Sequence, residues 1–232
     1  MTLPVFDVPQ FTTTLPSDGR KISFRPFLVK EQRQLLMAVA GSPQEQVMAV
    51  NNIIDACTFN KLNARRLPAF DVEYLFLQIR SKSIGENVEV MLTCANCGER
   101  TKNVLDVTKV AVNKSEGHSN TIDLGQNVII KMDYPRLEDL EIDPDTPNVD
   151  RIIQLIASCI QSIWQGEEMF AAEDYSMEEL IEFVENLSPE GLAKIEEFFK
   201  HMPVVQHAFE WDCGKCEHHN RVVMEGLQNF FG

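Results

Sequence analysis

The sequence predicts an α+β protein built from three kinds of segment. Residues 1–83 change from the alternating pattern of β-strands to the spacing of amphipathic helices. Two Cys-x-x-Cys motifs, Cys94–Cys97 and Cys213–Cys216, each lie between runs that alternate like strands. A long acidic stretch with helical periodicity separates the motifs. We therefore expect three domains, namely an N-terminal hairpin with helices over 1–83, a split β unit over 84–133 and 204–232, and an inserted acidic helical lobe over 134–203.

The first 83 residues contain signals for one hairpin and three helices. Asp18-Gly19 supplies the positive-φ positions of a tight turn, and Pro26 limits the strand that follows it. Ser42-Pro-Gln-Glu45 combines an N-cap serine, a first-turn proline and a capping-box glutamate, so a helix begins there. The apolar spacing places the three helices at about 30–40, 43–58 and 69–83.

The stretch between the two motifs predicts a further hairpin and three more helices. Thr121–Asp133 alternates around a turn and is interpreted as the hairpin. Apolar residues lie on several sides of Val149–Trp164, which is typical of a central helix. Ser176-Met-Glu-Glu179 is a capping box, and Ser188-Pro189 opens the next helix. Tyr134–Asn148, which is rich in proline and aspartate, is interpreted as the boundary of the lobe.

The four motif cysteines, Cys94, Cys97, Cys213 and Cys216, are the candidate metal ligands. Two strand–turn–strand units of this kind each present two thiolates, and four thiolates complete the tetrahedral coordination of a structural zinc ion. The split β unit is therefore interpreted as zinc-ribbon-like, although 115 residues (98–212) separate the two pairs. Zinc binding to small four-ligand modules is worth about 10–16 kcal/mol near neutral pH, enough to hold the base of the insertion together.

Two alternatives to a structural zinc site are also considered. His218 and His219 lie close enough to the second motif to compete as ligands of a catalytic zinc, although the pattern places them in the turn. Trp211-Asp-Cys-Gly-Lys-Cys216 loosely resembles a dithiol oxidoreductase motif, but such a motif should open a helix, and a strand pattern follows here. Cys57 and Cys159 lie in apolar helical patterns and are interpreted as inert buried thiols.

The distribution of charge argues against nucleic-acid binding. The net charge is −14, and residues 138–198 contain seventeen acidic residues but only two basic ones. Such an acidic lobe favours a basic protein partner, or simple solubility, over a phosphate backbone. The region around the first motif, residues 80–116, has six basic and five acidic residues, whereas a nucleic-acid-binding ribbon would be basic.

The sequence contains no signature of secretion, membrane insertion or catalysis. The N-terminus lacks a basic region followed by an apolar run, and no apolar stretch approaches the roughly 18 residues that a bilayer requires. We therefore expect a cytoplasmic protein, in which cysteine pairs bind metal rather than form disulfides. Phosphate-binding glycine loops, paired-histidine metalloprotease motifs and nucleophile elbows are absent from the sequence. These observations predict a protein that is not an enzyme.

Two groups of segments carry a resemblance to a known family. The first is Leu15–Glu31, which contains Phe-Arg-Pro-Phe-Leu-Val-Lys-Glu, followed by Leu35-Leu-Met-Ala38. The second is Tyr175–Leu187 together with Ile195–Pro203. Both groups resemble the baseplate hub proteins of T-even-like contractile-tailed bacteriophages. The block at Phe24–Glu31 is the more specific one, and the similarity extends over most of the chain, including both cysteine motifs.

Members of that family build the central hub of the tail baseplate, either as hub subunits or as hub-assembly factors. The resemblance therefore implies a non-enzymatic structural or assembly protein that contacts other baseplate hub or tail proteins. The alternatives are a chaperone for a hub or tape-measure component, absent from the mature virion, and, as a minor one, a dithiol redox protein. The implied location is the host cytoplasm during assembly and the virion tail baseplate if the protein is retained. Candidate contact surfaces are the N-terminal hairpin, the acidic helices and the C-terminal tail at 225–232.

Overall fold

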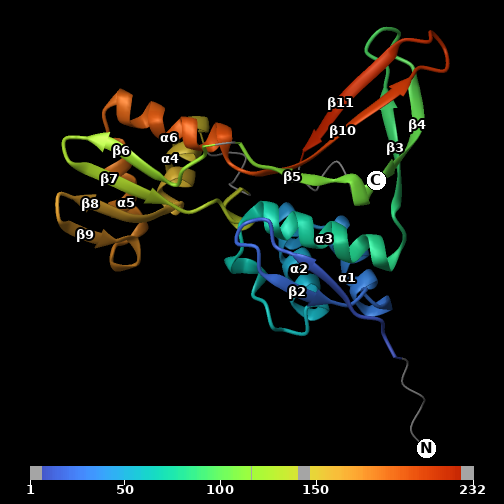
Figure 1. Cartoon of the computed structure of the whole chain (residues 1–232), viewed down its shortest axis with the longest axis horizontal. Helices are drawn as coiled ribbons and strands as arrows, with labels where there is room; N and C mark the ends of the chain where they lie inside the picture. The colour runs from blue at the N-terminus through green and yellow to red at the C-terminus, as the bar shows by residue number, and fades with distance from the viewer. Residues whose placement is uncertain (1–6, 116, 141–146, 226–232) are drawn as a thin grey trace, which may run out of the picture. The chain divides into compact units, whose positions relative to one another are not determined.

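The computed structural model describes residues 7–115, 117–140 and 147–225 (Figure 1). The chain divides into two compact units, of which unit 1 comprises Met1–Asn113 and Val204–Gly232 and unit 2 comprises Lys114–Pro203. Both units combine helices with small antiparallel sheets. The α+β class expected from the sequence is therefore confirmed.

A β-hairpin opens unit 1 and is anchored to a helix of the same unit. β1 (Phe11–Thr14) pairs antiparallel with β2 (Lys21–Phe24), as predicted, and Gly19 in the connecting turn has φ +75°. The turn is held by Asp71, whose buried carboxylate accepts one hydrogen bond from the Ser17 hydroxyl and another, at 3.1 Å, from the Ser17 N–H. A buried carboxylate thus fixes the hairpin turn in place.

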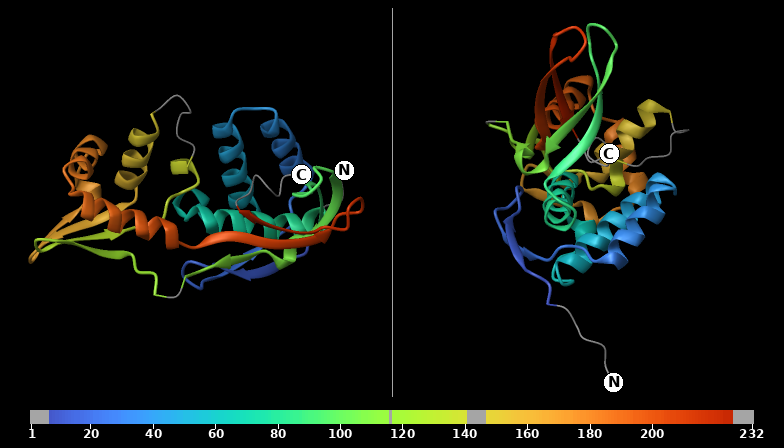
Figure 2. Two further views of the ribbon diagram at one scale, coloured as in Figure 1. Left: turned by 90° about the horizontal axis from the view of Figure 1, so that it is seen from above. Right: turned by 90° about the vertical axis from the view of Figure 1, so that its right-hand side faces the viewer.

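Three helices form the core of unit 1 at the positions that the sequence predicts. They are α1 (Val29–Val39), α2 (Pro43–Cys57) and α3 (Ala69–Ser83), with the short helix η1 (Ala64–Arg66) before α3. Because α3 is buried on several sides, it is the central helix of this unit. In Figure 2, α1 and α2 lie side by side against one side of α3, and the β1–β2 hairpin lies on the other side.

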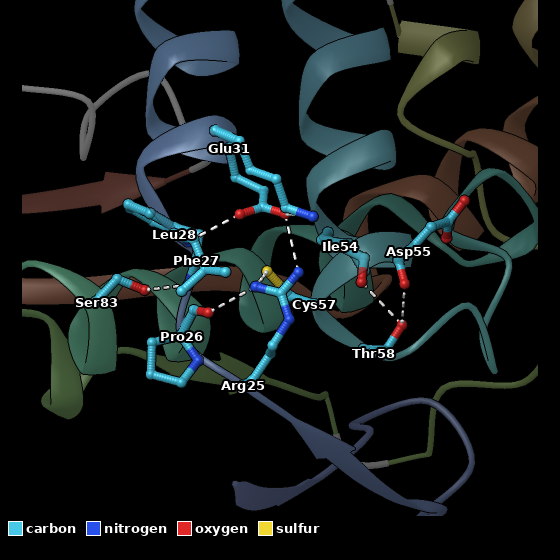
Figure 3. Close-up of polar contacts among 11 residues, drawn as sticks. Arg25, Pro26, Phe27, Leu28, Glu31, Ile54, Asp55, Cys57, Thr58 and Ser83 are labelled. Carbon is cyan, nitrogen blue, oxygen red and sulfur yellow. Dashed lines mark hydrogen bonds and ion pairs between the residues drawn. The ribbon is translucent and has the colours of Figure 1, made fainter. Parts of the chain in front are cut away.

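The segment between β2 and α1 is held by a buried ion pair (Figure 3). The Arg25 guanidinium lies 2.9 Å from the Glu31 carboxylate, and Glu31 is only 3% exposed. The second carboxylate oxygen of Glu31 accepts a hydrogen bond from the Leu28 N–H at 2.8 Å, which caps α1. The guanidinium also lies 3.8 Å from the sulfur of Cys57, the last residue of α2. This ion pair therefore joins the end of β2 to both α1 and α2.

Two further hairpins of unit 1 carry the cysteine motifs. β3 (Asn87–Thr93) pairs with β4 (Arg100–Asp106), and β10 (Val204–Asp212) pairs with β11 (His219–Glu225). The first three residues of β10 also pair with β5 (Ala111–Asn113). Since β5 directly precedes unit 2 and β10 directly follows it, this pairing brings together the two points between which the insertion lies.

Unit 2 is a four-stranded antiparallel sheet with helices on one face. The strand order is β6 (Thr121–Gly125), β7 (Val128–Met132), β8 (Ile160–Gln165) and β9 (Glu168–Ala171). The helices are α4 (Asn148–Ser158), α5 (Met177–Glu185) and α6 (Pro189–His201). Ile122 and Ile130 of the sheet share a buried cluster with Ile156, Leu180 and Ile195 of the helices, which lie along one sheet face (Figure 2). Across both units, none of the described helices has the length and apolar character to cross a membrane.

Capping boxes begin two helices where the sequence places them. At α2, the Glu45 carboxylate accepts from the Ser42 N–H at 2.7 Å, and the Ser42 hydroxyl accepts from the Glu45 N–H at 3.3 Å. At α5, Ser176 and Glu179 make the same two hydrogen bonds, at 2.8 and 3.3 Å. These reciprocal bonds satisfy backbone groups that would otherwise lack partners at a helix start.

The helix predicted over Val149–Trp164 is wrong in its last six residues. α4 ends at Ser158, and the residues from Ile160 onward form β8, which pairs with β7 on one side and β9 on the other. Ile160 and Ser162 are buried, whereas the residue between them is exposed, as expected for a strand. A run of isoleucines suits either structure, so pairing with neighbouring strands decides between them. β9, a short strand of four residues that pairs with β8, is also not predicted from the sequence.

The domain boundaries of the structure differ from those expected. The β6–β7 hairpin, assigned from the sequence to the split β unit, pairs with β8 and so belongs to unit 2. The inserted lobe is therefore mixed, with strands as well as helices. The N-terminal helices and the cysteine hairpins share unit 1, because α3 packs against β5, β10 and the short helix η2 (Val107–Lys109). The tail at 226–232 and the linker residues 141–146 lie outside the described residues.

Replacing Glu31 with glutamine is expected to destabilise the protein by about 3 kcal/mol at neutral pH, because Arg25 then stays buried without its anion. Burial alone would raise the pKa of Glu31, but hydrogen bonds from Arg25 and the Leu28 N–H hold this pKa below its ordinary value. The ion pair therefore stabilises the fold above the ordinary carboxyl range, and this contribution is lost as the pH falls through the folded pKa. Urea unfolding at several pH values should show that the difference in unfolding free energy between the wild type and Glu31→Gln becomes smaller at acidic pH.

Lys30→Gln is the matched control for this measurement. The Lys30 ammonium lies 3.5 Å from the Glu31 carboxylate, but its side chain is 71% exposed, so little stability depends on it. Its unfolding midpoint should stay near that of the wild type at each pH. Equal losses for the two variants, or a loss for Glu31→Gln that is independent of pH, would contradict the role of the ion pair.

Candidate metal centre

The two Cys-x-x-Cys motifs fold into turns with the same backbone hydrogen bonds. In the first turn, the Cys94 N–H donates to the Glu99 carbonyl at 2.8 Å, and the Cys94 carbonyl accepts from the Gly98 N–H at 3.0 Å. The second turn repeats both bonds between Cys213 and the residues five and four positions later, at 3.0 and 2.9 Å. Each turn joins two antiparallel strands, so both motifs lie at the ends of hairpins.

The two turns differ at one position that requires a left-handed backbone. Gly98, directly after Cys97, has φ +71°, which glycine adopts without steric cost. The equivalent residue after Cys216 is Glu217, with φ +58°. A side chain in this conformation costs about 1–2 kcal/mol. The glycine of the second motif, Gly214, lies inside the Cys-x-x-Cys sequence and does not occupy this position.

The four cysteines, which are far apart in the sequence, converge in unit 1. The sulfur atoms of Cys94, Cys97, Cys213 and Cys216 all lie within 4.8 Å of one another. Between the two hairpins, the Cys94–Cys216 and Cys97–Cys213 sulfur distances are 3.7 and 3.6 Å. Cys94 and Cys213 are buried, whereas Cys97 is exposed, and all four are free thiols. Four sulfur donors around a common centre can hold one metal ion.

Backbone hydrogen bonds favour the thiolate form of one cysteine in the cluster. The N–H of Cys97 makes the largest contribution, followed by that of Asn96 and the Asn220 amide, and together they lower the pKa of Cys94 to about 6. The N–H of Glu99 acts in the same sense on Cys97, but the neighbouring cysteines, Cys216 above all, together with partial desolvation raise the pKa of Cys97 to about 12. Several thiolates this close together repel one another. A cation bound among the sulfurs would offset this repulsion and favour the deprotonated form of all four cysteines.

Asn220, which the sequence does not single out, connects the two turns. It lies on β11 and is 3% exposed. Its amide nitrogen donates to the Cys94 sulfur at 3.5 Å and to the His218 carbonyl at 2.8 Å, while its oxygen accepts from the Ala95 N–H at 3.0 Å. A side chain of the second hairpin thus orients a sulfur of the first. In the sequence, Asn220 is a single asparagine near the start of a strand, and nothing in that pattern predicts its contact with Cys94.

The other candidate residues lie outside the cluster. His219 pairs with the Asp212 carboxylate at 2.9 Å, and this hydrogen bond raises the pKa of His219. In the described part of the chain, the four cysteines are the one group of three or more potential metal ligands. Burial raises the pKa of Cys57 to about 11 and that of Cys159 to about 12, so both thiols stay protonated at neutral pH. This agrees with their interpretation as inert.

Comparison with known proteins defines the class of the chain. Residues 8–232 match the family model described as T4 bacteriophage base plate protein, so the chain belongs to this family. The resemblance carried by Phe24–Glu31 and the helical segments is thereby confirmed. Among curated proteins, the baseplate hub assembly protein gp26 of Enterobacteria phage T4 is 26% identical over 211 residues, which cover 90% of this chain and 92% of that protein. No solved structure matches the chain.

Glu217→Gly is expected to stabilise the fold by up to about 1 kcal/mol, because relief of the left-handed backbone outweighs the greater freedom of glycine in the unfolded chain. Gly98→Ala at the equivalent position should destabilise it by a similar amount. Nothing lies within 4 Å of a Cβ added at Gly98, so that loss would come from the backbone alone. Thermal melts of proteins with equal metal content measure both effects, and two changes of the same sign would contradict the equivalence of the turns.

Proposed function

We propose that this protein is a non-enzymatic assembly protein of the bacteriophage tail baseplate hub and that it acts through protein–protein contacts. The observation that carries the proposal is the match to a baseplate hub assembly protein, which covers 90% of this chain and 92% of that protein. Similarity over nearly the whole of both chains supports a shared role better than similarity confined to one unit would. Its partners would be other baseplate hub or tail proteins.

The time at which the protein acts distinguishes two forms of this proposal. As an assembly factor, it would bind a hub or tape-measure component in the host cytoplasm and be absent from the mature virion. As a structural subunit, it would remain in the tail baseplate. The word "assembly" in the name of the relative favours the first form. The acidic residues of unit 2 would suit a basic client in either form.

We further propose that the four cysteines hold a structural zinc ion. Sulfurs bonded tetrahedrally to zinc at about 2.3 Å lie roughly 3.8 Å from one another. The two distances between the hairpins, 3.7 Å for Cys94–Cys216 and 3.6 Å for Cys97–Cys213, fit this geometry. Four thiolates fill the coordination sphere and leave no position for a reactive water molecule. The role of this site would therefore be to crosslink the two hairpins.

The elements around the cysteines favour metal binding over dithiol redox chemistry. In a dithiol oxidoreductase, the N-terminus of a helix lowers the pKa of the reactive thiol. Here Cys97 is followed by β4 and Cys216 by β11, so a strand stands where that helix would be. The second cysteine pair, within 4.8 Å of the first, also supports a shared ion.

Purified protein is expected to contain about one equivalent of zinc, and Cys94→Ser and Cys216→Ser should each lose the metal and melt at lower temperature. Acidification should release the zinc from the wild type, because protons compete with it for the thiolates. Elemental analysis combined with thermal melts measures both properties. Cys159→Ala is the matched control: its thiol is buried in unit 2, so this variant should keep its zinc and lose only packing energy.

The zinc proposal is refuted if the wild type carries less than about half an equivalent of the metal while all four thiols react freely with a thiol reagent. Equal thermal stability of Cys94→Ser and Cys159→Ala would also count against a metal crosslink.

Mass spectrometry of purified virions, alongside pull-down of the tagged protein from infected cells, tests the role in the baseplate. We expect the pull-down to recover a hub or tape-measure component. Absence from purified particles then identifies an assembly factor, and presence in them identifies a structural subunit. A protein that neither associates with hub components nor appears in particles would contradict the proposed function.

A further inference from the structure

The outer face of the sheet in unit 2 carries a row of exposed apolar side chains. Ile129 of β7 pairs with Trp164 of β8, which in turn pairs with Met169 of β9. These three residues are 39%, 39% and 51% exposed. Their neighbours Ile130 and Ile163 point to the opposite face, because side chains alternate along a strand, and they pack against the helices. The helices α4, α5 and α6 lie along that opposite face of the sheet (Figure 2).

A groove of about 770 Å³ adjoins this row. Trp164 and Met169 line it from the sheet, and Tyr175 and Met177 line it from the start of α5. Tyr175 and Met177 are 40% and 44% exposed, so the apolar surface continues from the sheet to the helix. A contiguous exposed surface of this kind in a soluble domain is typical of a protein-binding site.

The groove has three carboxylates and two cations in its lining, and the chain around it is strongly acidic. Its charged lining residues are Asp133, Asp139, Glu173, Lys131 and Arg136. Burial raises the pKa of Asp133, whereas the nearby cations Arg136 and Lys131 act in the opposite sense. In the surrounding chain, residues 138–198 contain seventeen acidic residues and two basic ones. A positively charged partner would therefore be attracted mainly by the acidic surroundings of the groove.

We propose that the row of Ile129, Trp164 and Met169, together with the adjoining groove, binds an amphipathic helix of a partner protein whose polar face is rich in lysine and arginine. A sheet face can bury its apolar side chains against helices, as the opposite face of this sheet already does. The apolar side of the partner helix would cover the row, and its cationic side chains would meet the carboxylates. This inference adds a binding surface to the proposed function. It rests on that function in one respect, namely that the protein has a protein partner.

A second copy of this chain fits the surface less well. The net charge of the chain is −14, and the acidic excess is concentrated in residues 138–198 of unit 2. Two copies of so acidic a unit would repel each other on approach, because like charges oppose association. Charge therefore selects a basic partner over self-association.

Trp164 provides a reporter of this binding within the full chain. The chain has two tryptophans, Trp164 and Trp211, so emission in a Trp211→Phe variant comes from Trp164 alone. The probe is a synthetic leucine–lysine amphipathic peptide, and a leucine–glutamate peptide of the same length is its charge control. We expect the basic peptide to shift Trp164 emission to shorter wavelength and the acidic peptide to leave it unchanged. Circular dichroism verifies that each variant is folded.

Substitutions in the Trp211→Phe background then locate the site. Met169→Ser should weaken binding of the basic peptide about tenfold, as expected for a central apolar contact. Asp133→Asn should weaken binding less and make it less sensitive to salt. Met37→Ser is the matched control, because Met37 is a 66% exposed methionine on α1 of unit 1. It should leave the affinity unchanged.

The remaining outcomes overturn the inference. Equal binding of the acidic peptide would show that charge plays no part, and unchanged affinity in Met169→Ser would place the site elsewhere. A Trp164 shift on raising the protein concentration without peptide, with a dimer in sedimentation, would identify a second copy as the occupant. Because association with hub components is measured separately, failure here leaves the baseplate role standing.

Discussion

The pairing of β10 with both β5 and β11 is the constraint on which the rest of the structure depends. The first residues of β10 pair with β5, and its last residue leads directly into the second cysteine turn. The insertion of 90 residues, Lys114–Pro203, therefore leaves and re-enters unit 1 at adjacent strands. The entropic cost of closing a loop grows only with the logarithm of its length. A whole folded unit can thus be inserted at this point without separating the strands on either side.

Within unit 1, side-chain interactions secure the segments that the fold brings together. The Arg25–Glu31 pair links β2 to α1 and α2, and the Phe27 N–H donates to Ser83 at the end of α3 at 2.9 Å. At the cysteine turns, the Asn220 amide bridges the two hairpins. The segment that carries the family resemblance, Phe24–Glu31, therefore has a structural role. The resemblance in this segment therefore indicates a shared fold and not a shared reactive site.

The candidate stabilising site and the proposed binding surface lie in different units. Unit 1 contains the cysteine centre, which has the donor set of a structural crosslink. Unit 2 contains the acidic stretch, the apolar row and the groove, which are the features that protein partners recognise. A crosslink next to β10 would restrain the strands that border the insertion without taking part in the binding surface. This division is compatible with an assembly protein, which must present a stable surface rather than perform a reaction.

Local patterns determined most elements and the candidate ligands. Caps such as Ser42 with Glu45 mark helix starts, and the Cys-x-x-Cys spacing names Cys94, Cys97, Cys213 and Cys216, because these signals act between residues close in the sequence. Only the tertiary structure decided that Ile160–Gln165 is a strand, that the β6–β7 hairpin joins unit 2, and that Asn220 contacts Cys94. Each of these depends on residues that are distant in the chain. The local sequence of an apolar run or of a single asparagine does not indicate which distant residues it will contact.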